Sequence, residues 1–285
     1  MAMYVSTFNH ADGFLAAAGE TLYAQETVNN LILGVSERLA EDPAAYENPF
    51  FAVVHDENGN LILAAVMTPP HNLILAGAKD AETGFADLIT HLRRQEIQVP
   101  GVIGPLELVK AFSRAWQQLV SEESDVNMHM RVYELRQVRM PALPTGMFRQ
   151  ATHVDCQLIA EWLQDFEAEA LGKLHELDLA RAERLVSHGN VFFWERDGKI
   201  VSMAMKNRPI AHSITVSGVY TPPEHRRQGY AGALVAQLSQ LLLDKGYQFV
   251  NLFTDLDNPT SNKIYQEVGY VPVCDFRSYH FKPKD

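Results

Sequence analysis

Residues 221–232 read TPPEHRRQGYAG and lie between a β-prone run, Ile214–Tyr220, and a segment with helical periodicity. In that segment leucines recur at i, i+4, i+7 and i+8, so one face is apolar: Leu234, Leu238, Leu241 and Leu242. Lys245 and Gly246 then supply a basic last turn and a residue suited to end a helix. We therefore expect a strand, a loop and a long helix from about Gly229 to Lys245.

The start of this expected helix is suited to bind an anion. The first turn of a helix presents free backbone N–H groups and the positive end of the helix dipole, and such sites hold phosphate. Gly229, Ala231 and Gly232 would let phosphate oxygens approach the backbone closely. Small residues at a helix start also serve close packing alone, and the residues leave that alternative open. A dinucleotide site and a P-loop are disfavoured because neither G-x-G-x-x-G nor G-K-[S/T] occurs.

A second polar motif follows a further β-prone run, Phe249–Thr254. Residues 258–265 read NPTSNKIY, and Gly269-Tyr270 comes shortly after. Asparagine is favoured as an N-cap and proline at the first helical position, so a helix is expected from about Asn258 to Glu267. Its spacing places four polar groups on one face: Asn258, Ser261, Asn262 and Tyr265. Such a stripe indicates a ligand-facing role, and a half-buried tyrosine bonded to backbone is the alternative.

The chain repeats one pattern of elements in its two halves. In each half an Asn-Gly or Asp-Gly turn joins two β-prone runs, Phe50–His55 to Leu61–Met67 and Val191–Glu195 to Ile200–Met205, which predicts a hairpin. A helical opening precedes each hairpin; a strand and then helix, strand, helix and strand follow it. This order predicts an α+β fold with a mixed sheet and a diverged internal duplication. The proline-containing segment 141–146 is the best linker, so we expect domains 1–142 and 143–285.

Charge and composition exclude several classes of function. The formal net charge is −11 and the pI about 5.4, which argues against nucleic acid as a partner. Cys156 and Cys274 make no disulfide framework, and the scattered histidines suggest no metal site. The N-terminus lacks a basic region followed by an apolar run, and no stretch of about 18 apolar residues occurs. We therefore expect no signal peptide, no membrane span and a cytoplasmic location.

Both motifs resemble those of the GNAT superfamily of N-acetyltransferases. Arg226-x-x-Gly229-x-Ala231 is similar to the family's Arg/Gln-x-x-Gly-x-Gly/Ala signature. The run from Asn258 to Tyr265, with Gly269-Tyr270, looks like its Asn-x-x-(Ala/Ser)-x-x-x-Tyr…Gly-(Phe/Tyr) segment. Together the motifs span roughly residues 214–276. The resemblance implies two tandem GNAT-like domains, each with a mixed, mostly antiparallel sheet flanked by helices.

The resemblance also implies acetyl-CoA as co-substrate. Backbone amides from about Arg227 to Gly232 would hold the coenzyme A pyrophosphate. Strand Ser217–Thr221 would splay from Phe249–Thr254 and admit the pantetheine arm like an added strand. The Val219 N–H would polarise the thioester carbonyl. The residues expected to contact acetyl-CoA are Val219, Tyr220, Thr221, Arg226, Arg227, Gln228, Gly229, Tyr230, Ala231, Gly232, Asn258, Ser261 and Asn262.

Tyr265 is the residue that the resemblance indicates as general acid for the leaving thiolate. A phenol with a pKa of about 10 and a thiol of about 8.5 are close enough for a positioned proton transfer. The base is left open. Glu167 and Glu169 lie in the helical opening that lines the acceptor pocket in the family, although a solvated helix face also explains them. The other candidates are Asp255, which a turn would explain equally, His212 and His225.

The first half lacks both motifs. Its counterpart of the phosphate loop is Gly77–Phe85, which carries acidic residues and no Arg/Gln signature, and nothing like residues 258–265 follows. We expect a degenerate GNAT-like domain without a donor site, which completes the acceptor pocket or shapes a domain or homodimer interface.

The function that follows is acetyl transfer from acetyl-CoA to a primary amine of a small molecule. The presence of Arg226, Gly229 and Tyr265 favours turnover over a non-catalytic CoA- or acyl-CoA-binding regulatory module. A protein lysine or N-terminal acetyltransferase is a third reading, but an additional domain capping the pocket favours a small acceptor.

Overall fold

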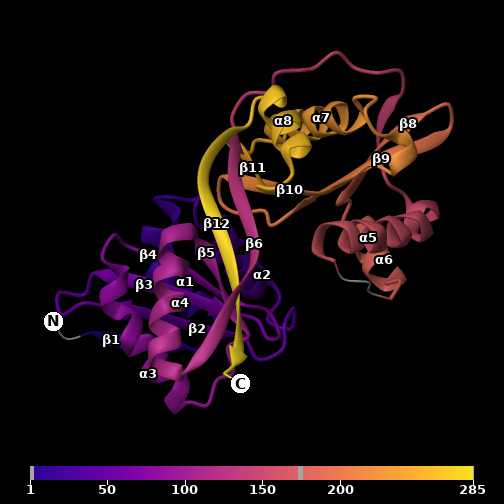
Figure 1. Cartoon of the computed structure of the whole chain (residues 1–285). Coiled ribbons are helices and arrows are strands. Elements are labelled where there is room, and N and C mark those ends of the chain that lie inside the picture. The colour runs from indigo at the N-terminus through magenta and orange to yellow at the C-terminus, as the bar shows by residue number, and fades with distance from the viewer. Residues whose placement is uncertain (1–2, 173–175, 285) are drawn as a thin grey trace. The chain divides into compact units, whose positions relative to one another are not determined.

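The computed structural model describes residues 3–172 and 176–284. The elements of the first half, in chain order, are β1 (Tyr4–Phe8), α1 (Ala11–Tyr23), α2 (Asn30–Glu41), β2 (Phe50–His55), β3 (Leu61–Met67), β4 (Leu73–Gly77), α3 (Phe85–Arg94), β5 (Gly101–Pro105), α4 (Leu106–Val120) and β6 (Glu122–Leu135) (Figure 1). Those of the second half are β7 (Met147–Gln150), α5 (Cys156–Leu171), α6 (Leu179–Ser187), β8 (Val191–Arg196), β9 (Lys199–Asn207), β10 (Ser213–Tyr220), α7 (Tyr230–Asp244), β11 (Phe249–Asp255), α8 (Pro259–Val268) and β12 (Val271–Pro283). Apart from short 3₁₀ turns, the order of strands and helices is the same in both halves, which confirms the repeat and the α+β fold.

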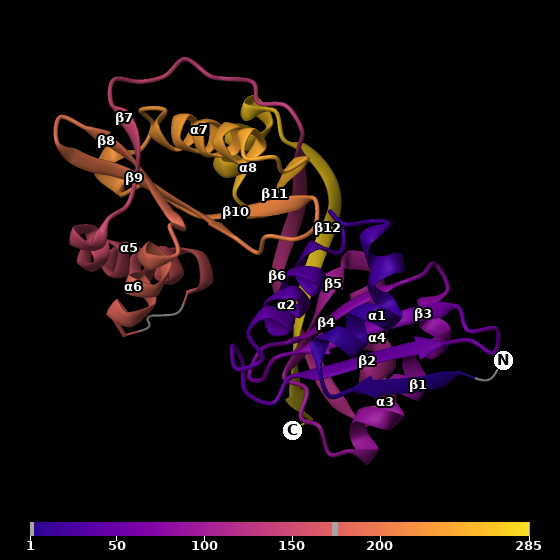
Figure 2. The ribbon, with the colours of Figure 1, turned by 180° about the vertical axis from the view of Figure 1, so that it is seen from behind.

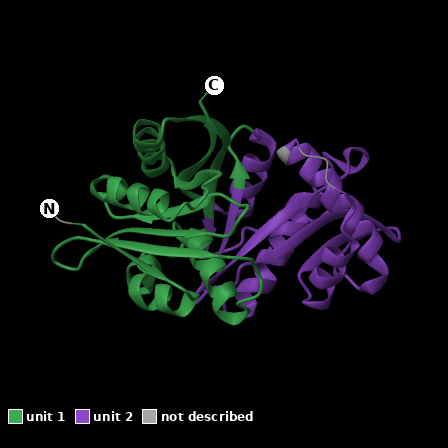
Figure 3. Cartoon of the chain, turned by 90° about the horizontal axis from the view of Figure 1, so that it is seen from below, with its two compact units in different colours: residues 1–133, 254–257, 272–285 green, residues 134–253, 258–271 purple. Residues whose placement is uncertain are grey.

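The chain forms two compact units (Figure 3). The first comprises residues 1–133, 254–257 and 272–285, and the second residues 134–253 and 258–271. The last strand, β12, therefore belongs with the first half, where it pairs antiparallel with β5 from Phe276 opposite Pro105 to His280 opposite Gly101. The division into domains 1–142 and 143–285 remains a prediction, since the compact units differ from it at residues 134–142, at 254–257 and in β12.

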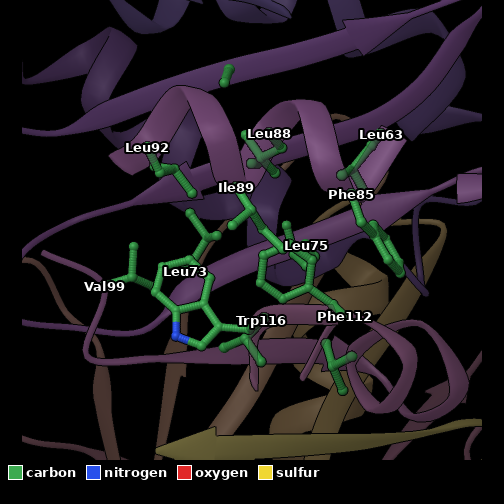
Figure 4. Packing of buried hydrophobic residues seen from close by; sticks show 14 of the residues in the cluster. Leu63, Leu73, Leu75, Phe85, Leu88, Ile89, Leu92, Val99, Phe112 and Trp116 are labelled. Carbon is green, nitrogen blue, oxygen red and sulfur yellow. The ribbon is translucent and has the colours of Figure 1, made fainter. Parts of the chain in front are cut away.

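The sheet of the first unit packs between two helical layers. Strands β1 to β4 pair antiparallel in sequence order, and β4 pairs parallel with β5. Helices α1 and α2 cover one face of this sheet, and α3 and α4 cover the other (Figure 2). Phe51 of β2 contacts Phe14 of α1, with ring centroids 5.6 Å apart, whereas Ala52 belongs to the buried cluster that includes residues of α3 and α4, among them Leu88 and Phe112 (Figure 4 labels both). Phe85 and Phe112 meet edge to face within that cluster, at 5.2 Å between centroids. Burial on both faces explains why β2 and β3 are continuously apolar.

The second unit has the same layered plan. Its strand order is β11-β10-β9-β8-β7, with β10 and β11 parallel and the other pairs antiparallel. Helices α5 and α6 cover a cluster that includes Phe193, Met203 and Met205. Helix α7 packs against the β8–β10 strands through a face of fully buried residues that includes Leu234 and Leu238. The two predicted hairpins, β2–β3 and β8–β9, are confirmed.

Local sequence signals explain the ends of α7 and α8. Gly229 is the N-cap of α7, and Lys245 is its C-cap, so the helix is one residue shorter at each end than expected. Asn258 caps α8 by accepting a hydrogen bond from the Ser261 N–H at 3.1 Å, and Pro259 occupies the first turn. No helix in the described part of the chain is long and apolar enough to cross a membrane.

Candidate functional site

The loop that precedes α7 is exposed, and its backbone is accessible. Gly229 has φ +82°, and a Cβ built on it would meet nothing within 4 Å. Arg227 also has a positive φ, +62°, which is uncommon for a residue other than glycine and is a feature of ligand-binding loops. A Cβ on Gly232 would instead lie 3.7 Å from Ile264 of α8. Gly229 therefore leaves the helix N-terminus open, whereas Gly232 lies where α7 packs against α8.

Beside this loop, β10 and β11 pair over only part of their lengths. Their parallel register runs from Ser213/Phe249 to Val216/Leu252, although β10 continues to Tyr220. On the other side of β10, Ser217 lies opposite Met205 and Tyr220 opposite Met203, so β10 contains one extra residue in this stretch. Gly218, with φ +54°, lies in this bulge. The bulge bends β10 where the splay from β11 was expected, next to Val219.

Arg226 links the loop to α5. Its Nη2 lies 2.6 and 2.9 Å from the two carboxylate oxygens of Glu169, and its Nε donates to the Thr221 carbonyl at 2.8 Å. The structure thus joins two predicted site residues, one assigned to the cofactor and one to the acceptor. Both side chains remain nearly half exposed, so the pair is screened by solvent and adds little to stability.

Arg196, at the end of β8, approaches the same loop and was not among the predicted site residues. Its Nη1 donates to the Tyr230 hydroxyl at 2.6 Å and lies 3.4 Å from Gln228 Oε1. The Tyr230 hydroxyl in turn donates to Gln228 Oε1 at 3.0 Å. The order of the strands could have predicted this contact. Because β9 runs antiparallel to both β8 and β10, the carboxyl ends of β8 and β10 lie at the same edge of the sheet. The end of β8 therefore places Arg196 near the start of α7, in addition to Arg226 and Arg227 of the loop.

Tyr265 lies in the interior of α8 and is 8% exposed. Its ring meets that of Tyr270 edge to face, at 6.1 Å between centroids. Burial raises the pKa of Tyr265 to about 12, so the phenol stays protonated at neutral pH. The Tyr270 hydroxyl is bonded to Ser239 at 2.8 Å.

The other polar residues of α8 mainly stabilise the helix start. The Asn258 side chain caps the helix, and Asn262 Nδ2 donates to the Asn258 carbonyl at 2.8 Å. Ser261 is half-buried, and its N–H is the one that Asn258 caps. These contacts account for the polar stripe locally; whether the stripe also faces a ligand remains a prediction.

The candidate bases differ in their surroundings. Glu167 is bonded to Arg181 of α6 at 2.6 Å, with the Glu167 side chain 16% exposed. Asp255 accepts the Asp257 N–H at 2.9 Å, the turn contact that was the alternative for it. His212 immediately precedes β10, at the end opposite the loop, whereas His225 lies within the loop. Glu169 is the candidate carboxylate that directly contacts the loop, through Arg226.

Tyr220 ends β10 next to these groups. It is buried against Trp162 of α5, with ring centroids 5.7 Å apart. Burial, with a smaller contribution from the nearby Glu169, raises the pKa of Tyr220 to about 12. Its backbone carbonyl accepts from Ser202 Oγ at 3.2 Å, which holds the end of β10 against β9.

The corresponding loop of the first half, Gly77–Phe85, is largely exposed but packed at its end, where α3 begins. A Cβ on Gly84, just before α3, would lie 3.1 Å from Val54 Cγ1, and Ala81 is buried. A Cβ on Gly104 of β5 would lie 2.6 Å from the Leu75 carbonyl of β4, so these strands stay in close contact past their register pair Ile74/Ile103. The first half is therefore more closely packed at Gly84 and Gly104 than the second half is at Gly229.

Known proteins match this chain in sequence and in fold. Residues 156–270 match the acetyltransferase (GNAT) family. No curated protein matches the chain. A GCN5-related N-acetyltransferase from Sphaerobacter thermophilus is 13% identical, with a TM-score of 0.64 over 98% of this chain and 95% of that one.

Two further solved structures extend over the full length. A Drosophila protein is 14% identical with a TM-score of 0.68, and a tandem GNAT protein from the clavulanic acid biosynthesis pathway is 14% identical with a TM-score of 0.60. Each comparison covers 100% of both chains. With identities of only 13–14%, the likeness establishes the fold alone, which is two GNAT-like domains in tandem.

Proposed function

Because residues 156–270 form a GNAT-type N-acetyltransferase domain, we propose that the chain moves an acetyl group from acetyl-CoA to the primary amine of a small molecule. The observation that carries the proposal is the open N-terminus of α7, with Gly229 unobstructed, beside a bulged strand that leaves its parallel partner. Backbone N–H groups from Arg227 to Gly232 would hold the pyrophosphate. The part of β10 beyond its register with β11, after Val216/Leu252, would pair with the pantetheine arm.

The chemistry requires a neutral amine, a polarised carbonyl and a stabilised thiolate. The amine nitrogen forms a bond to the acetyl carbon, the carbon–sulfur bond breaks, and the proton lost by nitrogen balances the one gained by sulfur. The Val219 N–H is the proposed donor to the carbonyl oxygen. Tyr265 is the proposed general acid: its O–H hydrogen bond strengthens as charge develops on sulfur, and its proton passes to the leaving sulfur. Because its pKa is about 12 and that of a thiol about 8.5, the phenol must regain a proton as it gives one up, and the proton lost by nitrogen, carried by solvent, replaces it.

Glu169 is the proposed acceptor-side carboxylate. Arg226 holds the Glu169 carboxylate beside the loop through two contacts. An incoming ammonium group would therefore meet a carboxylate whose charge Arg226 already partly neutralises. Glu167, paired with Arg181, is proposed to position α5 against α6. Asn258, Ser261 and Asn262 are proposed to face the cofactor from the start of α8, and Tyr220 and Thr221 from the end of β10.

The first half is proposed to lack a donor site. The packed loop around Gly84 and the close approach of Gly104 to Leu75 support this, since neither leaves room for a phosphate or an added strand. Each chain is therefore expected to bind one acetyl-CoA.

Arg196 is a proposed additional ligand of the coenzyme A phosphates. Changing Arg196 to Gln is expected to weaken acetyl-CoA binding about 5- to 10-fold, because one charge-assisted contact is lost while the backbone site stays intact. Isothermal titration measures the affinity. Arg184→Gln, which removes an exposed arginine from α6, is the matched control. Equal affinities for wild type and Arg196→Gln at low salt would remove Arg196 from the site.

Amine-dependent release of coenzyme A thiol tests the function. The chain is incubated with acetyl-CoA and a panel of amino acids, polyamines, amino sugars and lysine peptides. Release that depends on a small amine supports the proposal. Tight acetyl-CoA binding without release for any amine favours the regulatory module, and release with peptides alone favours a protein acetyltransferase.

A further inference from the structure

A row of polar side chains crosses three neighbouring strands of the second unit. Thr215 of β10 lies opposite Asn207 of β9 and opposite Asn251 of β11. Residues directly opposite on paired strands project from the same face, and Ser213 and Ser217, two positions to either side of Thr215, share it. We call these five residues the polar row.

Hydrogen bonds confirm that the polar row shares one face. Asn251 Nδ2 donates to Ser213 Oγ at 2.9 Å, and Asn207 Nδ2 donates to Ser217 Oγ at 2.7 Å. Three members are almost fully buried: Ser213 and Asn251 are 0% exposed and Thr215 is 1% exposed. The two asparagines are thus fixed from either side of β10.

Three buried atoms of the polar row have no hydrogen-bond partner: Asn207 Oδ1, Thr215 Oγ1 and Asn251 Oδ1. Turning either amide round would exchange which of its atoms is unpaired, but would still leave one on each side chain. Buried polar groups in native proteins are nearly always paired. Three unpaired groups side by side on adjacent strands therefore indicate a polar ligand.

The polar row leads to the proposed reacting centre. Ser217 lies opposite Met205, which belongs to the cluster beneath α5 and α6, so the row is on the α5–α6 side of the sheet. It ends next to the bulge at Gly218, where Val219 is the proposed donor to the thioester carbonyl. From Ser213 to Ser217 the row extends about 13 Å, at roughly 3.3 Å per residue. That length suits a small molecule with its amine at the Ser217 end.

The chemistry of the row selects a class of acceptor. Its members offer hydroxyl and amide groups and no charge. A second ammonium group along the row would find no carboxylate among its members, whereas hydroxyl groups both donate to and accept from these side chains.

We infer that the polar row is the acceptor subsite and binds the hydroxyl groups of a polyhydroxylated primary amine. The inference rests on the proposed function, which supplies the reacting centre, and goes beyond it by naming the acceptor class. Thr215 lies at the centre of the row and is the specificity-determining residue.

The test compares two six-membered-ring amines, D-glucosamine and cyclohexylamine, in the full-length protein. Thr215→Val removes the hydroxyl and keeps the side-chain shape. It should lower kcat/KM for D-glucosamine about 5- to 10-fold, leave cyclohexylamine unchanged and leave acetyl-CoA affinity unchanged. Each amine is compared between wild type and variant, so the different basicities of the two amines cancel. Thr215→Ser should retain activity, and Thr68→Val, which removes another buried threonine hydroxyl, should change neither amine.

Asn251→Leu provides a second variant should Thr215→Val fold poorly, and it should discriminate between the amines in the same way. An equal effect on both amines, or none, overturns the inference. So does a wild-type protein that acetylates cyclohexylamine but neither acetylates nor binds D-glucosamine. If acetyl-CoA itself does not bind, the proposed function fails, and the acceptor subsite falls with it.

Discussion

Replacing Tyr265 with phenylalanine is expected to lower kcat about 10- to 100-fold and to leave acetyl-CoA affinity within a factor of two. The expected loss corresponds to one hydrogen bond to a charged group, about 1.5–3 kcal/mol, made only as the thiolate develops. A residue used only in the transition state changes kcat and kcat/KM together. Thiol release under saturating acetyl-CoA measures kcat, and isothermal titration measures affinity.

The matched control is Tyr270→Phe. Tyr270 is also buried and packs against Tyr265, and its hydroxyl is bonded to Ser239. Its loss should affect stability and leave the chemistry intact. Because the pKa of Tyr265 is about 12, the phenol remains protonated throughout the ordinary assay range, and its ionisation should produce no decline in rate between pH 7 and about pH 10. Unchanged kcat in Tyr265→Phe would remove this residue from the mechanism.

Changing Gly229 to glutamate is expected to weaken acetyl-CoA binding by at least about 100-fold. A carboxylate would stand where the pyrophosphate is proposed to bind, and repulsion between charges about 4 Å apart is worth several kcal/mol near a protein surface. The left-handed backbone at Gly229, φ +82°, adds about 1–2 kcal/mol of strain for a residue with a Cβ. Isothermal titration with acetyl-CoA measures the effect.

Helix α7 offers its own control for this variant. Gly246, just past the other end of the helix, also has a positive φ, +101°, and also leaves a Cβ with nothing within 4 Å. Gly246→Glu therefore introduces comparable strain and the same charge away from the loop, and should bind acetyl-CoA as wild type does. If both variants lose binding equally, the effect is one of stability, and the phosphate assignment fails.

Local signals were enough to predict most elements of both halves. The Asn-Gly and Asp-Gly turns predicted both hairpins, and the structure has positive φ at Gly59 of the first turn and at Asp197 and Gly198 of the second. Leucines at helical spacing gave α7 to within one residue at each end, and Asn258-Pro259 gave the start of α8. Each of these patterns involves residues that are close in sequence, so local interactions are enough to determine the turn or helix.

Contacts between residues that are distant in sequence could not be predicted from these local patterns. Both halves end in a β-prone run, and nothing in the residues of β12 says that it pairs with β5, more than 150 residues earlier. The Arg196–Tyr230 contact requires the strand order, and the polar row requires the register of three strands. Glu167 and Glu169 are only two residues apart, yet Glu167 pairs with Arg181 of α6 and Glu169 with Arg226 of the loop before α7.

The stoichiometry of acetyl-CoA binding to the full-length chain tests the central claim most directly. Isothermal titration is predicted to give one site per chain, which Gly229→Glu abolishes and Gly246→Glu preserves. Two sites per chain, or one site that Gly229→Glu leaves intact, would contradict the assignment of the donor site to the loop before α7.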